Sequence, residues 1–157
     1  LGPAVARTDN LAGGAEMARH LRARGLRRVA VIAGPEEAPA SRDRLAGFAS
    51  VLRPVAVTHG DYGAASGAAA TPGLLRHAPD AVFCANDLMA LGAMDAAPPG
   101  LKVFGFDGIP EGALPRYRLT TMAQDMEALA EAALALLERP GEQRLIPARL
   151  VVRGESV

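Results

Sequence analysis

The sequence has few of the residues on which several classes of protein depend. Tryptophan is absent from its 157 residues, and aromatic residues make up only 4%. The one cysteine, Cys84, lies in an apolar stretch, which excludes a disulfide framework and favours a buried thiol in a reducing compartment. Basic and acidic residues number 17 each, so the zero net charge gives no basic footprint for nucleic acid or for a membrane surface.

Long apolar runs and catalytic motifs are also lacking. No run reaches the roughly 18 apolar residues of a membrane span, and Leu1 to Arg7 does not have the pattern of a signal peptide. G-x-S-x-G, Walker A and H-E-x-x-H are missing. The histidines at 20, 59 and 77 do not have metal-ligand spacing. We therefore expect no enzyme activity, no cofactor, no metal site and no membrane partner.

The residues that are abundant, Ala, Leu, Val and Gly, form apolar runs separated by segments with helical spacing. The expected strands are 3–7, 29–33, 56–58, 80–85 and 102–106, and the expected helices are 11–24, 42–52, 64–76 and 87–96. Regular alternation predicts an α/β fold in three layers, with a parallel sheet of about five strands flanked by helices. A short extended segment at 119–122, a helix at 125–138 and a last strand at 150–153 follow.

Two local features qualify this prediction. Gly13 and Gly14 weaken the first turn of the first helix, which indicates close packing there. Pro72 lies inside the third helix and should shorten or kink it, because proline has no N–H to donate and its ring clashes with the preceding turn.

Polar residues at strand ends and in the adjoining loops and helices are the candidates for a binding site, because the carboxyl ends of parallel strands line ligand crevices. Carboxylates, a guanidinium and an amide together suit a polyhydroxy or otherwise polar small ligand, and a tyrosine can supply a ring face. A purely structural role is about equally expected for each residue taken alone, as a helix cap, a turn former or a surface ion pair. The candidates are Arg44, Asp61, Tyr62, Asn86, Asp87 and Asp107.

At this point the sequence resembles a family, the LacI-type transcriptional regulators. The resemblance covers nearly the whole chain and rests on segments that occur in the expected order. The block that contains Asn86-Asp87 and the block that contains Gly105-Phe106-Asp107 are shared in looser form by periplasmic sugar-binding proteins. The block that begins with Leu119-Thr120-Thr121 favours the regulators. The segments are Asp9-Asn10, SRDRLAGF (41–48), GDY (60–62) with Ser66-Gly67, VFCANDLMALGAM (82–94), VFGFDGIPEGAL (103–114), LTTMAQDMEALAEAALALL (119–137) and LVVRGES (150–156).

The resemblance implies an effector clamped between two α/β subdomains, and an N-terminal helix-turn-helix headpiece that binds operator DNA in a dimer. The positions that match effector contacts in the family are Arg44, Tyr62, Asn86, Asp107 and Gln124. The residues alone had already indicated the first four, whereas Gln124 comes from the resemblance. The sequence departs from the family pattern in short segments after Phe48 and after Ala97, and in a glycine at position 108.

The resemblance also implies a division of the chain. Residues 1–122 would be the C-terminal effector-binding subdomain, and 123–157 a helix and final strand that cross to and from an N-terminal subdomain, with the headpiece absent. We expect a cytoplasmic homodimer that senses a sugar-like or nucleoside-like effector. A solute-binding protein of a sugar transporter is the first alternative, and an enzyme on a doubly wound fold is the second.

The helix expected at 125–138 has an apolar stripe whose partner in the family is the N-terminal subdomain. Exposed apolar side chains are costly, since burying each is worth about 1.5–3 kcal/mol. We therefore expect this helix either to pair with another copy or to fold back on its own chain.

Overall fold

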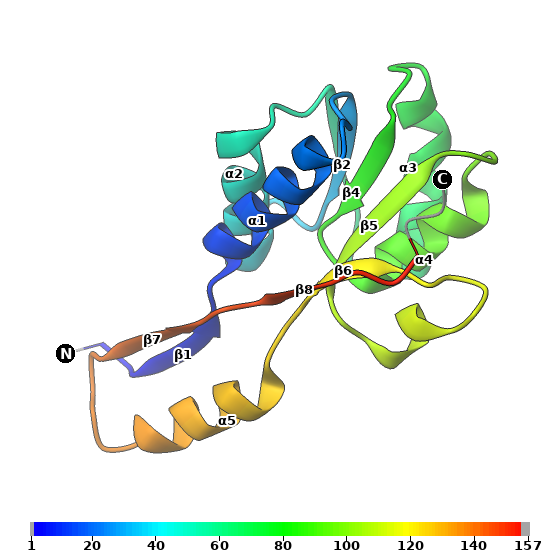
Figure 1. Cartoon of the computed structure of the whole chain (residues 1–157). Helices are drawn as coiled ribbons and strands as arrows, with labels where there is room; N and C mark the ends of the chain where they lie inside the picture. Colours follow the sequence, from blue (N-terminus) through cyan, green and yellow to red (C-terminus); the bar gives the residue numbers. More distant parts are fainter. Residues whose placement is uncertain (1, 155–157) are drawn as a thin grey trace.

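The main body contains a six-stranded sheet with the order β3-β2-β4-β5-β6-β8, shown in the computed structural model in Figure 1, which describes residues 2–154. All neighbouring strands are parallel except β8, which runs antiparallel to β6. The predicted parallel sheet of about five strands is confirmed. The strands are β2 (Val29–Ala33), β3 (Ala56–His59), β4 (Ala81–Cys84), β5 (Lys102–Asp107), β6 (Thr120–Ala123) and β8 (Arg149–Val151).

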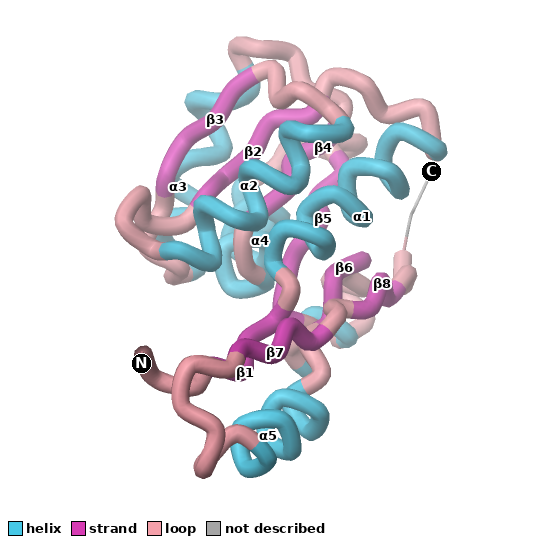
Figure 2. Tube along the Cα trace, turned by 90° about the vertical axis from the view of Figure 1, so that its left-hand side faces the viewer, coloured by secondary structure: helices cyan, strands magenta, loops and turns pink. Residues whose placement is uncertain are grey.

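Helices cover both faces of this sheet (Figure 2), as the three-layer prediction requires. Two helices, α1 (Asn10–Ala23) and α2 (Pro39–Val51), pack on one face, and α3 (Ala64–Leu75) and α4 (Asp87–Ala96) on the other. Successive residues of β2 enter opposite cores, and every residue of β2 and β4 is buried. Burial on both faces explains why these strands are continuous apolar runs without alternation.

Glycines allow α1 and α2 to approach until their backbones touch. A Cβ on Gly14 would lie 2.1 Å from the carbonyl oxygen of Arg44, and a Cβ on Gly47 would lie 1.9 Å from that of Leu11. A Cβ on Gly13 would similarly meet the Phe106 ring at 2.7 Å. The close packing predicted around Gly13 and Gly14 is confirmed, and it fixes α2 against the first turn of α1.

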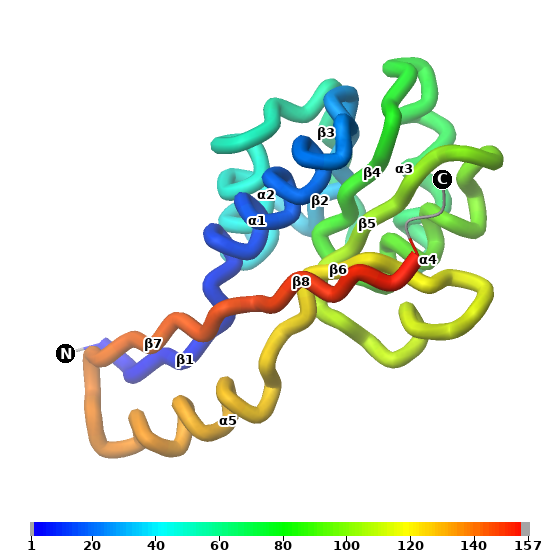
Figure 3. Tube along the Cα trace, viewed as in Figure 1, coloured from blue at the N-terminus to red at the C-terminus, as the bar shows by residue number. Residues whose placement is uncertain are grey.

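A small unit projects from the body where the strands end (Figure 3). It consists of β1 (Val5–Thr8) paired in parallel with β7 (Gln143–Ile146), with α5 (Met126–Ala135) packed on β1. We call β1 and β7 the ribbon. The chain passes between this unit and the body three times, before α1, after β6 and before β8. The proposed division at residue 122 stays a prediction, and its ends, Leu1 and residues 155–157, lie outside the described residues.

The helix α5 folds back on its own chain, which is one of the two expected arrangements. Ala132 and Leu136 are buried, whereas Met126, Leu134 and Leu137 are each more than 60% exposed. The ribbon therefore covers only part of the apolar stripe.

Two elements differ clearly from the sequence-based expectation. The strand β7 was not predicted, because its residues are mostly exposed and include Gln143 and Arg144. The helix α5 is shorter than the expected 125–138. The helix α3 agrees closely with the expected 64–76, since it spans Ala64–Leu75 with Pro72 inside it.

The contact between α1 and α2 yields a prediction. Gly47→Ala should destabilise the fold by about 1–3 kcal/mol, because the added methyl group forces two backbones apart. Gly73→Ala in α3 is the matched control. Its Cβ would meet only the Arg76 side chain at 3.6 Å, so about 0.5–1 kcal/mol of stabilisation is expected. Urea unfolding of both variants measures the difference, and equal stabilities would contradict the close contact.

Candidate functional site

Three of the five predicted site residues meet where β5 and β6 end. An Nη1 atom of Arg44, on α2, lies 3.2 Å from Oδ1 of Asp107, the last residue of β5. The side-chain amide of Gln124, just after β6, donates to the same Oδ1 at 2.8 Å. One carboxylate oxygen thus joins a helix and the ends of two neighbouring strands.

The Arg44 guanidinium is buried by residues of α1, of β5 and of the end of β4. It is 5% exposed and lies 3.8 Å above the centre of the Phe106 ring. Its Nε donates to Oδ1 of Asn10 at 2.8 Å, and its Nη1 donates to the carbonyl oxygen of Ala85. The Phe106 ring and three acceptor oxygens, of Asn10, Ala85 and Asp107, fix the plane of the guanidinium. Of these three oxygens, only the Asp107 carboxylate oxygen is charged.

Burial shifts both charged groups of this ion pair towards neutrality. Desolvation lowers the pKa of Arg44 despite the attraction of Asp107, and it raises the pKa of Asp107 despite the attraction of Arg44. The two shifts agree that the cost of removing these charges from water exceeds their mutual attraction.

The backbone at Asp107 is strained, and Asp87 holds it in place. Asp107 has φ 126°, a value that favours glycine. The fully buried Asp87 carboxylate accepts hydrogen bonds from the N–H groups of Gly108 at 2.7 Å and Ile109 at 2.9 Å, and from the Thr121 hydroxyl at 2.6 Å. Burial raises the pKa of Asp87, against these three hydrogen bonds. Asp87 therefore shapes the turn that presents Asp107, besides starting α4.

Asn86 and Tyr62 form a separate pair. The side-chain oxygen Oδ1 of Asn86 caps α4 by accepting from Met89 N at 3.1 Å, and the side-chain amide of Asn86 donates to the Tyr62 carbonyl oxygen at 2.9 Å. Tyr62 has φ 71°, and its ring packs on Gly34, where a Cβ would lie 2.4 Å from a ring carbon. Among the described residues, Tyr62 and Asn86 make no hydrogen bond with the other three predicted site residues. Tyr62 is nevertheless within electrostatic reach of Arg44.

Two buried residues of this region were not predicted. Thr8 donates its hydroxyl to Oε1 of Gln124, and Asn10 accepts from Arg44. The signals in the sequence were a run of three polar residues, of which one, Asp9, suffices to cap α1, and the segment Asp9-Asn10 shared with the LacI-type regulators. The candidate Asp61, by contrast, is exposed and accepts from Gly63 N at 2.8 Å, so it shapes its own turn.

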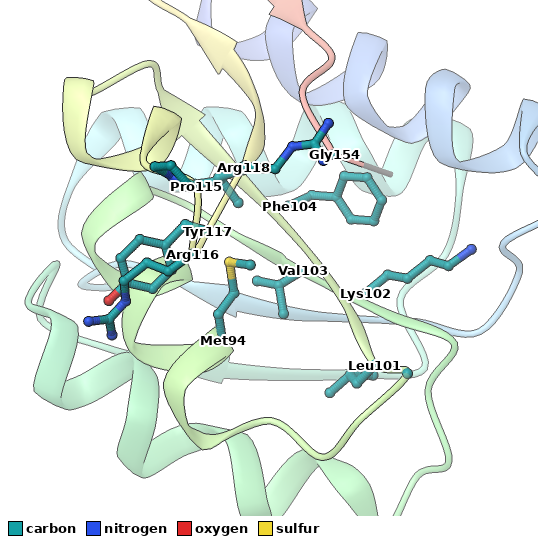
Figure 4. A pocket seen from close by; sticks show the side chains of 12 residues that line it. Met94, Leu101, Lys102, Val103, Phe104, Pro115, Arg116, Tyr117, Arg118 and Gly154 are labelled. Atoms are coloured by element: carbon teal, nitrogen blue, oxygen red, sulfur yellow. The ribbon is translucent and has the colours of Figure 1, made fainter. Parts of the chain in front are cut away.

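Two hollows of the surface show where a small molecule could fit. One cavity of about 260 Å³ lies far from the ion pair, near the start of β5 and β6, around Met94, Val103 and Tyr117 (Figure 4). None of the five predicted site residues lines it. A second hollow, of about 370 Å³, includes Gln124 and Arg149. The Arg44–Asp107 pair is thus part of an open strand-end surface and not of an enclosed cavity, with the Asp107 side chain 26% exposed.

Within residues 2–154, no group of three or more His, Cys, Asp or Glu side chains is arranged to hold a metal ion. In the same part of the chain, no helix is long and apolar enough to cross a membrane. Burial raises the pKa of the Cys84 thiol, in keeping with the expected structural role of this residue.

The sequence is similar to known bacterial proteins. The profile of the periplasmic binding protein-like domain family matches residues 18–156. The HTH-type transcriptional repressor CytR of Escherichia coli K12 is 34% identical over 171 aligned positions, which cover 94% of this chain and 50% of the repressor. The repressor PurR of Klebsiella pneumoniae is 34% identical over 80% of this chain and 41% of its own length. The chain thus spans about half the length of the curated relatives it matches.

Solved structures show the same relationship. The regulator CelR in complex with cellobiose has a TM-score of 0.88 and 29% identity, covering 98% of this chain and 54% of CelR. A LacI family regulator from Enterococcus faecalis with bound ribose has a TM-score of 0.85 and 27% identity, covering 96% and 62%. A dimeric Lac repressor has a TM-score of 0.86 and 30% identity, covering 94% and 62%.

The role of Asp87 can be tested by Asp87→Asn. The amide cannot accept all three hydrogen bonds, so buried donors lose partners and the free energy of unfolding should fall by about 1–3 kcal/mol. Asp95→Asn on the same helix is the control. It changes only exposed contacts, an ion pair with Arg116 and a hydrogen bond from the Tyr117 hydroxyl, and should cost less than about 1 kcal/mol. Urea unfolding compares the two, and a larger loss in Asp95→Asn would contradict this assignment.

The burial of Asp107 predicts a pH dependence of stability. Its pKa is raised above the ordinary value of 3.8, so above that value the folded state binds a proton more readily than the unfolded state. Relative to Asp107→Asn, the native chain should therefore lose stability as the pH rises from 3.8 through the raised pKa. Urea unfolding across a pH series measures this difference.

Asp80 supplies a control of opposite sign for the pH series. Hydrogen bonds from the backbone N–H groups of Arg28 and Arg27 lower the pKa of the Asp80 carboxyl. Relative to Asp80→Asn, the native chain should keep its advantage above pH 3.8 and lose it as the pH falls through the lowered pKa. The same sign for both residues would contradict the assigned environments.

Proposed function

The chain belongs to the family of periplasmic-binding-protein-like domains found in LacI-type transcriptional regulators, and from this membership we propose that it is the effector-sensing part of such a regulator. Its relatives are named as transcriptional repressors, which favours this function over the solute-binding protein of a transporter. In the whole protein, a DNA-binding headpiece outside this sequence would contact the operator.

The observation that carries the proposal is the buried Arg44–Asp107 pair. Burial disfavours the charged form of each group, although the pair lies at an open strand-end surface. Charged groups whose pKa values are shifted by burial and by a specific charged partner are characteristic of binding sites. Within residues 2–154, Nη2 of Arg44 and Oδ2 of Asp107 have no hydrogen-bond partner, so a donor and an acceptor remain for a ligand.

These two free groups favour a hydroxyl-bearing effector. A hydroxyl group donates one hydrogen bond and accepts others, so it can satisfy Oδ2 of Asp107 and Nη2 of Arg44 together. Because the two charges cancel, the pair offers no net attraction to an anionic ligand. Two similar structures hold ribose and cellobiose, which supports a sugar or a nucleoside-like effector here.

The five predicted residues take distinct roles in this proposal. Arg44 and Asp107 bind hydroxyl groups, and Gln124 orients the carboxylate. Tyr62 offers its ring to the flat face of a sugar or base, and Asn86 holds the Tyr62 backbone through its hydrogen bond to the carbonyl oxygen. The chain catalyses no reaction in this scheme, since binding alone changes the state of a regulator.

The remaining parts of the proposal concern the whole protein. It would act in the cytoplasm, where operator DNA lies, and as a homodimer, in keeping with the dimeric Lac repressor among the similar structures. Effector binding would shift the equilibrium between two arrangements of the regulator by differential affinity.

Asp107→Ala should weaken effector binding by about tenfold or more, because ligand hydroxyls lose a charged acceptor. The test titrates a panel that includes D-ribose, cellobiose and nucleosides by calorimetry on the full-length protein, and by NMR shifts on this chain, where we expect weak binding. Asp95→Ala, with its exposed carboxylate, is the control and should bind like the native protein. Equal affinities of Asp107→Ala and native protein would remove Asp107 from the site, and turnover of a bound sugar would revive the enzyme alternative.

A further inference from the structure

The segment that joins the ribbon to α1 contains two buried polar side chains whose contacts all lead to the candidate site. Thr8 is 4% exposed and Asn10 is 6% exposed. Neither is needed to start the helix, because Asp9 between them caps α1 by accepting from Ala12 N at 2.9 Å. A buried polar group must find partners, and the partners of these two are Gln124 and Arg44.

Five side chains and one backbone carbonyl close a ring of polar contacts. Gln124 donates to Asp107, Asp107 pairs with Arg44, and Arg44 donates to Asn10. Asn10 then donates to the Thr8 carbonyl oxygen at 3.1 Å, and the Thr8 hydroxyl donates to Gln124. The ring starts and ends on Thr8, so the last residue of β1 is linked to the ion pair by two separate routes.

Chemistry fixes the direction of each amide in this ring. The guanidinium of Arg44 can only donate, so the Asn10 oxygen must face it and the Asn10 amide nitrogen must face Thr8. The Asp107 carboxylate accepts from Gln124, which leaves the Gln124 oxygen to accept from the Thr8 hydroxyl. Each amide therefore has a single orientation that satisfies both of its neighbours.

We propose that Thr8 and Asn10 are positioning residues of the effector site, which hold Gln124 and Arg44 in their binding orientation and connect that orientation to the ribbon. The proposal rests on the function proposed above, since it assigns these residues to the same site. Thr8 pairs with Ile146 of β7, and the following N–H, of Asp9, donates to the Ile146 carbonyl oxygen at 2.8 Å. A ligand that moves Gln124 or Arg44 thus acts directly on a residue of the ribbon.

Thr8→Val is the decisive variant, because valine keeps the branched shape of threonine and replaces only the hydroxyl by a methyl group, which cannot donate a hydrogen bond to Gln124. Among the described residues, the Thr8 side chain makes no hydrogen bond with Arg44, so the hydrogen-bonded route from its hydroxyl to Arg44 runs through Gln124 and Asp107. In the 15N-labelled chain without ligand, we expect the Arg44 Nε–H proton to exchange with solvent about threefold faster in Thr8→Val. Asn10→Leu, which removes the acceptor itself, should accelerate this exchange by about tenfold or more.

Two controls separate positioning from general loosening. Thr8→Ser restores the hydroxyl and should exchange within about twofold of the native chain. Arg7 lies on β1 next to the ring and forms a 3.0 Å ion pair with Asp43 on α2. The substitution Arg7→Ala breaks this ion pair and loosens the contact between β1 and α2, but it removes no member of the ring. It should leave the Arg44 Nε–H exchange within about twofold of native. Melting temperatures of all variants are recorded in parallel.

The outcomes decide the proposal with or without a known effector. Unchanged exchange in Thr8→Val, or equal acceleration in Arg7→Ala, would overturn it, and if Asn10→Leu does not fold, Thr8→Val decides alone. In full-length protein that binds D-ribose, Thr8→Val should weaken the binding about threefold, and Thr8→Ser should restore it. A native protein that binds no member of the sugar and nucleoside panel would contradict the proposed function, whereas the exchange rates would still decide whether Thr8 and Asn10 position Arg44.

Discussion

A guanidinium group cannot give up its charge inside a protein, so a chain that buries one must surround it with acceptors. Arg44 carries such a group, and the residues that surround it bring α1, β4 and β5 together at the candidate site. Its acceptors come from the start of α1, the end of β4 and the end of β5, with an aromatic ring of β5 beneath it. Three elements must therefore converge within hydrogen-bond distance of one side chain, and the strand-end surface has its form because they do.

The same region combines several departures from the rules that most of the fold obeys. Elsewhere apolar runs form buried strands and small residues lie between packed helices. Here one buried cation lies among two carboxylates whose pKa values burial raises, and one of them, Asp107, also has a strained backbone. Consistency across levels is the norm for a sequence that specifies one fold, and local violations with no structural benefit mark functional sites. The Asp87 carboxylate stabilises the strained backbone at Asp107. It accepts two hydrogen bonds from the turn after Asp107 and a third from Thr121 of β6.

The sequence predicted the fold well where one physical signal dominates. Continuous apolar runs predicted the parallel sheet because burial on both faces excludes polar residues, and Gly13 and Gly14 predicted the tight helix packing. The strand β7 was missed because it pairs through its backbone, while its exposed side chains include Gln143 and Arg144. Backbone pairing at an exposed edge has little requirement for particular side chains, so such a strand leaves little trace in a sequence.

The candidate site was predictable only in part. Asp107 could be predicted from its place at a strand end, while Gln124 was inferred from the resemblance to LacI-type regulators, and the role of the five predicted residues in effector binding stays a prediction. Thr8 and Asn10 were missed because they lie in a short polar run beside Asp9, and the cap that Asp9 provides for α1 is a sufficient reason for polar residues there. Asp87 was a candidate for ligand binding, but its hydrogen bonds to the turn after Asp107 were not predictable, since a carboxylate at the start of a helix is favourable without them. A residue that satisfies a local rule gives no sign of its contacts with distant segments.

The close approach of α1 and α2 has a mechanical consequence for Arg44. Its own carbonyl oxygen touches Gly14 of α1, so the backbones that carry Arg44 and Asn10 have no space in which to slide past one another. Cores packed this tightly move as rigid bodies. The two helices therefore form a rigid pair, and the backbone of Arg44 keeps its position relative to α1. Movement within the site is therefore left to the Arg44 side chain and to the residues at the ends of β5 and β6.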